Sequence, residues 1–297
     1  MAMKTIATLN FKGGVGKTTM AWLLANYLAK EKGKKALLMD MDAQMSLTLA
    51  ITLQERTGKL NPVFQSWYEG RHIKKENTIL DGLDAYDRYA RGRGSFDFPV
   101  GADFIFSQLH PNLGFVPSVS DLYWLELEVF DRDATRTYIK DLLTRVSVFL
   151  RKEYNYEYDY CFLDCPPSFS LLSYSTLCCC GLVLLPVNPD VFAARGVEIM
   201  LEGLKLKIAP YPLPKVLAFM NKAKTWGGAP TYETSFYLDE VRRVCDQTVT
   251  RLQLQVKTAD TWIPERVDIK RAIPRGEIPR QFMPHFAALW DEIEKFI

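Results

Sequence analysis

Short apolar runs alternate along the chain with longer stretches in which apolar residues recur every three or four positions. The short runs predict buried strands, and the longer stretches predict helices that bury one face. Apolar strands separated by helices are typical of a parallel sheet that is covered on both sides. We therefore expect an α/β fold with a doubly wound, mostly parallel sheet and helices on both faces. In such a sheet, ligands bind beyond the carboxyl ends of the strands.

The pattern gives each element an approximate range. The expected strands are Thr5–Leu9, Ala36–Met39, the pair Asp103–Gln108 and Asn112–Val116, Tyr158–Leu163, Gly181–Val187 and Lys215–Met220, with Thr261–Ile263 as a candidate last edge. The expected helices are Lys17 to about Lys32, Ser120–Phe130, Ala134–Lys152, Phe169–Cys179, Val191–Leu206, Tyr232–Cys245 and Pro279–Phe296. Gly33 directly follows the first of these helices, as is typical of a helix C-terminus.

Residues 55–111 are less regular than the rest of the chain. They include a polar stretch, Asp81–Ser95, which predicts a surface loop. No repeat is visible, and no linker would justify a second domain. We therefore expect a single domain over residues 1–297, with 55–111 as a variable segment within it.

Composition narrows the function classes. The chain is 48% hydrophobic and 24% charged, with a formal net charge of +2. This charge is too small to indicate a polyanionic partner by itself, so any surface for nucleic acid must be a local basic patch. No apolar run approaches the roughly 20 residues that a membrane-spanning helix needs. No signal peptide is visible either, so we expect a cytoplasmic protein.

The six cysteines suit neither a disulfide framework nor a zinc site. They include no Cys-x-x-Cys pair, and three of them are adjacent. We expect buried, reduced thiols that pack as small apolar groups. The cysteines are Cys161, Cys165, Cys178, Cys179, Cys180 and Cys245.

A glycine-rich loop lies between the first expected strand and the first expected helix. It reads Phe-Lys-Gly-Gly-Val-Gly-Lys-Thr-Thr from Phe11 to Thr19. Its glycines let backbone N–H groups point at phosphate oxygens, and the start of the helix adds partial positive charge. In this context Lys17 is expected to neutralise the β- and γ-phosphates, and the Thr18 hydroxyl is expected to ligate Mg²⁺. We therefore predict that ATP and Mg²⁺ bind to the loop residues Lys12, Gly13, Gly14, Val15, Gly16, Lys17, Thr18 and Thr19.

Acidic residues follow two of the expected strands. Asp40 and Asp42 come after the second strand, and Asp164 ends the apolar run that begins at Tyr158. Carboxylates at these positions suit Mg²⁺ and a group that orients the attacking water in phosphoryl transfer. The alternative is that all three only cap helices.

The glycine loop and these two acidic segments together resemble the ParA/MinD family, and ParA/Soj-type partition and cargo-positioning ATPases in particular. The deviant phosphate loop of that family is Lys-Gly-Gly-Val-Gly-Lys-Thr-Thr. The resemblance implies that Lys12 crosses a dimer interface to the partner's nucleotide. It also implies that Asp42 positions the attacking water, and that Asp40 and Asp164 serve the magnesium ion. Ala43 stands where proline is common in the family.

The resemblance covers most of residues 3–50 and 112–297. It continues through the strand and turn at Leu184–Pro189. Asn221 follows a strand at a position where relatives often place an adenine-binding asparagine. Pro264 belongs to an Ile-Pro turn whose backbone lies near the adenine in the family.

The resemblance also implies a function. ParA relatives form an ATP sandwich homodimer that binds nonspecific DNA and positions plasmid, chromosome or protein cargo, and a ParB-like or cargo-adaptor activator stimulates hydrolysis. We accordingly expect a nucleoid-associated protein in the cytoplasm. Nonspecific DNA binding needs several basic residues on one face. The candidates are Lys222, Lys224, Arg242, Arg243, Arg266, Lys270, Arg271, Arg275 and Arg280, with Glu265, Asp268 and Glu277 among them.

Two other functions on the same fold remain open. A membrane switch like MinD needs a basic amphipathic helix at its C-terminus. The helix expected at Phe286–Ile297 is amphipathic, but its polar face carries three acids and one lysine. We therefore expect it to pack against the domain and to bind no membrane. A metabolic enzyme would need exposed cluster-binding cysteines or a second substrate pocket, and the sequence offers no recognisable sign of either.

Overall fold

The computed structural model describes residues 3–52, 86, 88–89, 91–93, 105–124, 136–209, 211–272 and 277–297. Within these residues, eight strands form one sheet in the order β10-β7-β6-β1-β5-β2-β4-β3. Neighbouring strands are parallel, except that β3 runs antiparallel to β4. The strands are β1 (Lys4–Thr8), β2 (Ala36–Asp40), β3 (Phe106–His110), β4 (Leu113–Val116), β5 (Tyr160–Asp164), β6 (Leu182–Val187), β7 (Lys215–Met220) and β10 (Val256–Thr258). The predicted doubly wound, mostly parallel α/β fold is confirmed.

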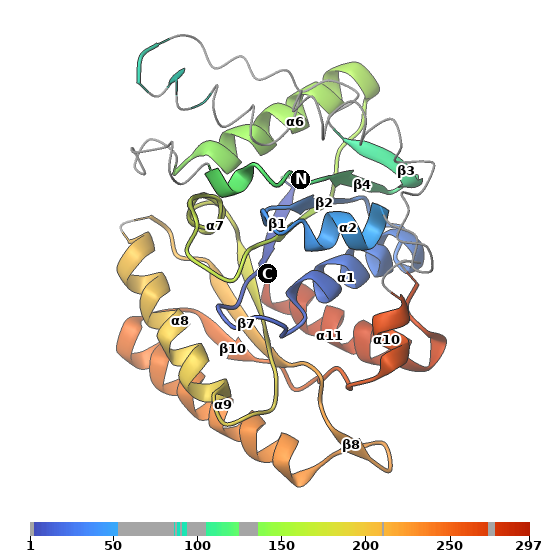
Figure 1. Ribbon diagram of the computed structural model, residues 1–297, viewed down its shortest axis with the longest axis vertical. Coiled ribbons are helices and arrows are strands. Elements are labelled where there is room, and N and C mark those ends of the chain that lie inside the picture. Colours follow the sequence, from blue (N-terminus) through green and yellow to red (C-terminus); the bar gives the residue numbers. More distant parts are fainter. Residues whose placement is uncertain are drawn as a thin grey trace.

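Helices cover both faces of this sheet (Figure 1). Alternate strand residues point to opposite sides, so the two faces build two separate hydrophobic cores. One core joins the sheet to α6, α7, α8 and α9, and the other joins it to α1, α2 and α11. The helices are α1 (Lys17–Glu31), α2 (Ser46–Thr52), α6 (Tyr138–Tyr154), α7 (Leu171–Leu177), α8 (Ala193–Ile208), α9 (Tyr232–Leu252), α10 (Val267–Ala272) and α11 (Met283–Phe296).

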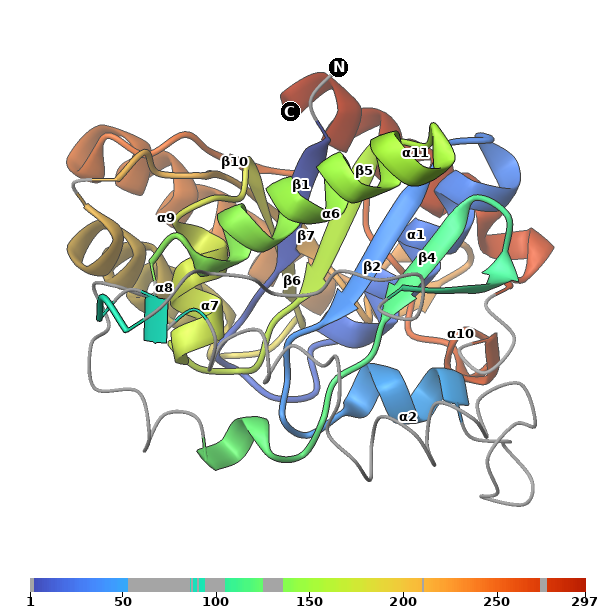
Figure 2. The same cartoon turned by 90° about the horizontal axis from the view of Figure 1, so that it is seen from above.

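The parallel strands all end on one side of the molecule, which faces the reader in Figure 1 and lies at the bottom of Figure 2. The connections β1–α1, β2–α2, β5–α7, β6–α8 and the turn after β7 therefore meet on this side. This is where a doubly wound sheet binds its ligands.

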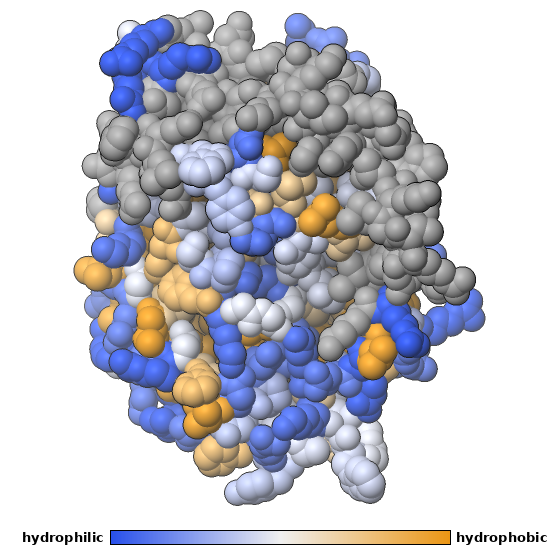
Figure 3. Space-filling model, in the orientation of Figure 1, coloured by the Kyte–Doolittle hydropathy of each residue, from blue (hydrophilic) through white to orange (hydrophobic). Residues whose placement is uncertain are grey.

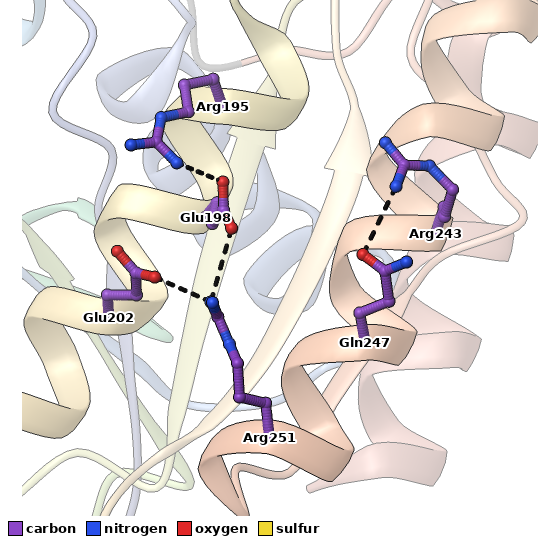
Figure 4. Close-up of polar contacts among 6 residues, drawn as sticks. All are labelled: Arg195, Glu198, Glu202, Arg243, Gln247 and Arg251. Carbon is purple, nitrogen blue, oxygen red and sulfur yellow. Dashed lines mark hydrogen bonds and ion pairs between the residues drawn. The ribbon is translucent and has the colours of Figure 1, made fainter.

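Helices α8 and α9 lie side by side and share an ion-pair network on their exposed surface (Figure 4). Arg251 on α9 donates to Glu202 at 2.8 Å and to Glu198 at 3.4 Å, and Arg195 donates to Glu198 at 2.5 Å. Glu198 is 27% exposed and the other three side chains are 43–66% exposed, so each ion pair contributes only about 0.2–1 kcal/mol, and only the two pairs of Arg251 join the helices. The network therefore adds little to the contact between α8 and α9, which share a buried apolar core.

The C-terminal helix α11 packs against the domain, as the sequence predicted. Its apolar side chains Phe286, Leu289, Trp290 and Ile293 are each at most 1% exposed. Within the described residues, none of the helices is long and apolar enough to span a bilayer.

Two sequence expectations need correction. Thr261–Ile263 is not the last edge strand; that place belongs to β10, which pairs with β7. The segment instead leads into a turn in which the Ile263 N–H donates to Met220 and Pro264 bridges to Ala223. Helix α9 also continues to Leu252, beyond the predicted end at Cys245.

Several short elements were not predicted from the sequence. These are α2, α10 and a hairpin formed by β8 (Thr225–Trp226) and β9 (Ala229–Pro230). The predicted strand pair over 103–116 is present as β3 and β4. Of the helix expected at Ser120–Phe130, the structure describes residues 120–124, of which Leu122–Trp124 is helical.

Most of 55–111 lies outside the described residues, as does most of the loop expected at Asp81–Ser95. Tyr86 within that stretch is 4% exposed, and its hydroxyl contacts Thr137 and Asp141. At this position the expectation of a simple surface loop is therefore wrong.

The cysteines are free thiols. Cys161, Cys165, Cys180 and Cys245 are buried, which confirms the expectation for these four. Cys178 and Cys179 are only partly buried.

Candidate nucleotide site

The glycine loop opens on a cleft of about 570 Å³ at the carboxyl ends of the strands. Gly14 and Gly16 have φ values of 72° and 96°, in the left-handed region that favours glycine. A Cβ atom at Gly16 would also lie 2.3 Å from Nδ2 of Asn221. Gly16 is therefore required both by its backbone conformation and by its contact with Asn221. The lining residues are Gly13, Gly14, Gly16, Lys17, Thr18, Thr19, Asp42, Gln44, Ser46, Pro167, Asn221, Lys222, Pro264, Glu265, Arg266 and Ile269.

Lys17 stands at the first position of α1 and is only 8% exposed. Burial lowers the pKa of its ammonium group, whereas the nearby carboxylates of Asp164 and Asp42 raise it. A buried ammonium group without an anion is costly, so the position favours an anionic ligand in the cleft. Partial positive charge at the start of α1 acts in the same direction.

Asp40 and Asp164 end neighbouring strands and lie in register with each other. Their exposed fractions are 0% and 1%. Burial raises the pKa of both carboxyl groups, and the charge of Asp40 raises that of Asp164 further. Thr8 and Thr18 each donate a side-chain hydrogen bond to Asp164. Two adjacent buried carboxylates are strongly stabilised by a cation, so this part of the site favours one.

The donor set fits Mg²⁺ in a nucleotide complex. Mg²⁺ prefers oxygen ligands and is usually held by one or two carboxylates together with substrate phosphates and water. Asp40, Asp164 and the Thr18 hydroxyl supply such oxygens beside the phosphate loop. In the part of the chain that the structure describes, no group of three or more His, Cys, Asp or Glu side chains could hold a metal alone. The phosphates would therefore have to complete the coordination.

Asp42 differs from these two carboxylates because it is partly exposed and lines the cleft. Its N–H donates to Asp40 Oδ1 at 3.1 Å, and its own Oδ1 accepts the N–H of Gln44 at 2.9 Å. The segment thus places one carboxylate inside the protein and the next one in the cleft. Of these two carboxylates, only that of Asp42 is accessible from the cleft.

Lys12 does not line the cleft in this single chain. Its Nζ lies 2.5 Å from Asp190 Oδ2 and 5.6 Å from the centre of the Phe192 ring. Both of these residues belong to the connection between β6 and α8. The Lys12 side chain is 42% exposed. Asp190 was not predicted from the sequence, because nothing in the local pattern indicates which acid contacts Lys12.

The two residues expected near the adenine also line the cleft. Asn221 follows β7, and its Nδ2 donates to the Val15 carbonyl at 2.6 Å. The structure therefore brings Asn221 and Pro264 together with the glycine loop. Val15 is 1% exposed and does not line the cleft.

The expected DNA-binding residues occupy different surroundings. Lys222 and Arg266 line the nucleotide cleft, where Lys222 donates to the Gly14 carbonyl and Arg266 donates to Thr225 Oγ1 at 2.7 Å. Arg271 and Arg280 are exposed, whereas the side chains of Lys270 and Arg275 lie outside the described residues. The other candidates form ion pairs, namely Lys224 with Glu233, Arg242 with Asp239 and Asp260, and Arg243 with Glu240.

Known proteins are similar to this chain in sequence. A family model for an AAA domain matches residues 3–209. The chromosome-partitioning ATPase Soj of Treponema pallidum is 28% identical over 279 residues, which cover 92% of this chain and 87% of that protein. The chromosome partitioning protein ParA of Myxococcus xanthus is 29% identical over 210 residues, covering 68% of this chain and 58% of that protein.

Solved structures share its fold. An ATP complex of an McdA variant from Cyanothece has a TM-score of 0.69 at 19% identity and covers 99% of this chain and 96% of that one. A putative plasmid partition protein of Borrelia burgdorferi bound to AMPPNP has a TM-score of 0.63 at 20% identity, covering 99% of this chain and 100% of that one.

The family model spans well over half of the chain, from β1 to the residue after α8, and so includes the glycine loop and all three acidic residues. Both relatives described above are chromosome-partitioning proteins, and Soj of Treponema pallidum is named as an ATPase. The chain therefore belongs to the ParA/Soj family of ATPases.

Proposed function

We propose that this protein is a partition or cargo-positioning switch that binds and hydrolyses ATP as a homodimer and binds nonspecific DNA in its ATP state. The observation that carries the proposal is the grouping of Lys17, Asp40, Asp42 and Asp164 around the glycine loop, with one carboxylate in the cleft and two buried behind it. This is the charge arrangement that Mg²⁺-dependent phosphoryl transfer needs.

Each side chain has a separate task in the proposed reaction. Lys17 and the loop N–H groups hold the β- and γ-phosphates, and Asp42 orients the attacking water. Thr18, Asp40 and Asp164 would hold Mg²⁺. When bound, the ion would neutralise charge that develops on the phosphates. Asn221 and Pro264 would contact the adenine end of the nucleotide.

The position of Lys12 supports the proposed homodimer. Its ammonium group pairs with Asp190 instead of lining its own cleft. We propose that it leaves Asp190 when ATP binds and contacts the nucleotide of a second copy. Because the Lys12–Asp190 pair is substantially exposed, separating it costs only about 0–1 kcal/mol. ATP binding can readily supply that energy.

The surface around the cleft is consistent with a dimer that forms and separates. Obligate interfaces are usually more hydrophobic than transient ones. In the coloured part of Figure 3, hydrophobic groups on the nucleotide side are scattered among hydrophilic ones. Val191 and Phe192, next to Asp190, are 69% and 68% exposed and are available for such contacts.

The DNA part of the proposal follows from the family rather than from a large positive field. Arg242, Arg243 and Lys224 are largely neutralised by neighbouring acids. We therefore place the DNA contacts of a single chain mainly at the exposed Arg271 and Arg280. The partner that stimulates hydrolysis would be a ParB-like or cargo-adaptor protein, and the site of action would be the nucleoid in the cytoplasm.

The structure favours neither alternative function. The apolar face of α11 is already buried against the sheet, so it would have to detach before it could enter a membrane. The described cysteines are free thiols that lie mostly inside the protein, where they are poorly placed to bridge a cluster between subunits.

The direct test is binding to a random-sequence DNA duplex with ATP, with ADP and without nucleotide, at two salt concentrations, with ATP turnover measured in parallel. We expect tight DNA binding only when the nucleotide is ATP. The affinity for DNA should fall at higher salt, because contacts to DNA phosphates release counterions. Turnover without DNA binding in any state would remove DNA from the proposal. Absence of turnover with DNA and Mg²⁺ present would remove the hydrolysis step.

A further inference from the structure

The segment that carries Asp40 and Asp42 is closed by two buried hydroxyl residues from other elements. Thr48 lies near the start of α2, and Ser118 follows β4. Both have an exposed fraction of 0%. Neither residue belongs to the phosphate loop or to the acidic segments.

Their hydrogen bonds form a closed ring with the two aspartates. Thr48 donates its N–H and its hydroxyl to Asp40 Oδ2, at 2.8 and 2.7 Å. The Ser118 N–H donates to the Thr48 hydroxyl oxygen at 2.9 Å, and the Ser118 hydroxyl donates to the Asp42 carbonyl at 2.7 Å. The Asp42 N–H closes the ring on Asp40 Oδ1 at 3.1 Å. The ring thus joins the end of β2, helix α2 and the segment after β4.

The ring fixes the backbone of Asp42 on both sides of its Cα atom. Its N–H is held by Asp40, and its carbonyl oxygen is held by Ser118 and by the N–H of Met45 at 2.9 Å. Met45 itself has a left-handed φ of 55°, so the chain turns back sharply here. With both peptide groups fixed, little backbone motion remains that could move the Asp42 carboxylate. Only its side-chain torsions are left to adjust.

We propose that Ser118 and Thr48 are positioning residues that hold the Asp42 carboxylate where it orients the attacking water. This inference rests on the proposed function, in which Asp42 has that role. A displacement of the order of 1 Å in a reacting group can lower a rate by about a hundredfold. Loss of the ring should therefore reduce turnover much more than nucleotide binding, because neither residue lines the cleft.

The test compares Ser118→Ala with Ser175→Ala in the full chain. Ser175 is a matched control: it is 1% exposed, it accepts the Ile139 N–H at 3.0 Å and it donates to the Arg136 carbonyl at 3.1 Å, away from the cleft. The measurements are kcat and KM for ATP with Mg²⁺, together with the melting temperature. We expect Ser118→Ala to lower kcat about ten- to a hundredfold with KM changed less than about threefold. Ser175→Ala should leave both values near those of the parent.

Two further variants separate positioning from folding. Ser118→Thr keeps the hydroxyl and should retain most of the parent kcat. Thr48→Val removes the same ring at another point and should reproduce the kcat loss even if Ser118→Ala folds poorly. Equal kcat values for folded Ser118→Ala, Thr48→Val and Ser175→Ala proteins would overturn the positioning role while leaving the hydrolysis proposal intact. A parent protein without turnover would instead overturn both.

Discussion

At the scale of single residues, the charged groups of the site differ mainly in how they are buried. Asp40 and Asp164 lie behind the cleft with almost no exposure, whereas Asp42 lines the cleft and is partly exposed. Lys17 is buried beside Asp164 and Asp42. A buried group can hold an ion or a phosphate, but only a group with access to the cleft can contact a water molecule there. These differences give each residue a separate expected phenotype.

Replacement of Lys17 and of Asp42 should therefore affect different steps. Lys17→Ala removes the ammonium group at the phosphates and should abolish ATP binding. Asp42→Ala should leave ATP binding and dimer formation near parent levels and lower turnover by at least about a hundredfold. Titration calorimetry with ATP and Mg²⁺, light scattering and a phosphate-release assay would measure the three properties. Parent turnover in the Asp42→Ala protein would contradict the role given to this carboxylate.

Gly16 offers a test of the loop geometry itself. Its φ of 96° costs a residue with a Cβ about 1–2 kcal/mol, and the collision with Asn221 adds to that cost. Gly16→Ala should destabilise the protein in urea unfolding and remove ATP binding. Gly33→Ala is the matched control, because its φ is 61° and no atom lies within 4 Å of the added Cβ. Gly33→Ala should lose only the stability that the left-handed backbone costs a residue with a Cβ, and it should keep ATP binding. ATP binding by Gly16→Ala at the parent level would contradict the described loop.

The half-buried thiol of Cys178 should show a displaced pH dependence. Burial raises the pKa of Cys178 to about 11, although nearby Arg136 lowers it in part. Because the thiolate is the reactive form, only about one molecule in a thousand is reactive at pH 8. Alkylation by iodoacetamide, followed by mass spectrometry, should rise about tenfold per pH unit between pH 8 and 10. A rate that levels off between about pH 9 and pH 10 would show an ordinary thiol pKa instead.

At the scale of elements, the sequence predicted those parts of the fold that have strong apolar patterns. Strands such as Leu182–Val187 are buried along their whole length, so their residues form continuous apolar runs. Edge strand β10 is only half-buried, so Val256–Thr258 shows no such run. Thr261–Ile263 looked more like a strand because it contains the apolar residues Trp262 and Ile263. In the structure Ile263 is buried, but it belongs to the turn that leads to Pro264.

The candidate site was predictable to a similar extent. The glycine loop and the acidic strand ends are local patterns, so their residues could be identified from the sequence. Asp190, Thr48 and Ser118 meet the site through contacts between distant segments, as in the Lys12–Asp190 pair, which spans 178 positions. A single serine or aspartate has no local signal for such a contact. Of the ion pairs of Arg242 and Arg243, only Arg242–Asp260 joins two segments in this way, whereas Arg242–Asp239 and Arg243–Glu240 are local pairs three positions apart on α9.

Helix α11 provides a prediction at the scale of one element. Trp290 is 1% exposed and packs against Tyr160 and Phe162 of β5. Trp290→Ala should therefore cost about 3–5 kcal/mol in urea unfolding, whereas Asp291→Ala on the exposed face of the same helix should cost less than about 0.5 kcal/mol. Equal stability of the two variants would contradict the packing of α11 against the sheet. Binding of the parent protein to anionic vesicles through this helix would contradict it as well.

At the scale of the whole molecule, two copies of the chain would complete each other's sites. One chain supplies the phosphate loop, the buried carboxylates and Asp42 to its own cleft. Its Lys12 lies outside that cleft, next to the exposed Val191 and Phe192. In a dimer with two-fold symmetry, both copies would exchange the same contact. An ATP-dependent dimer of this kind would be the active form of the switch.

Mixing two inactive variants tests this claim most directly. Lys12→Ala keeps its own Asp42 but has no lysine to donate, whereas Asp42→Ala can donate Lys12 but cannot hydrolyse its own ATP. In an equal mixture with random pairing, heterodimers should restore about a quarter of the parent turnover, because each contains one complete site. We predict this recovery with ATP and Mg²⁺ present. No turnover above that of the separate variants, although light scattering detects dimers, would contradict the action of Lys12 across the interface.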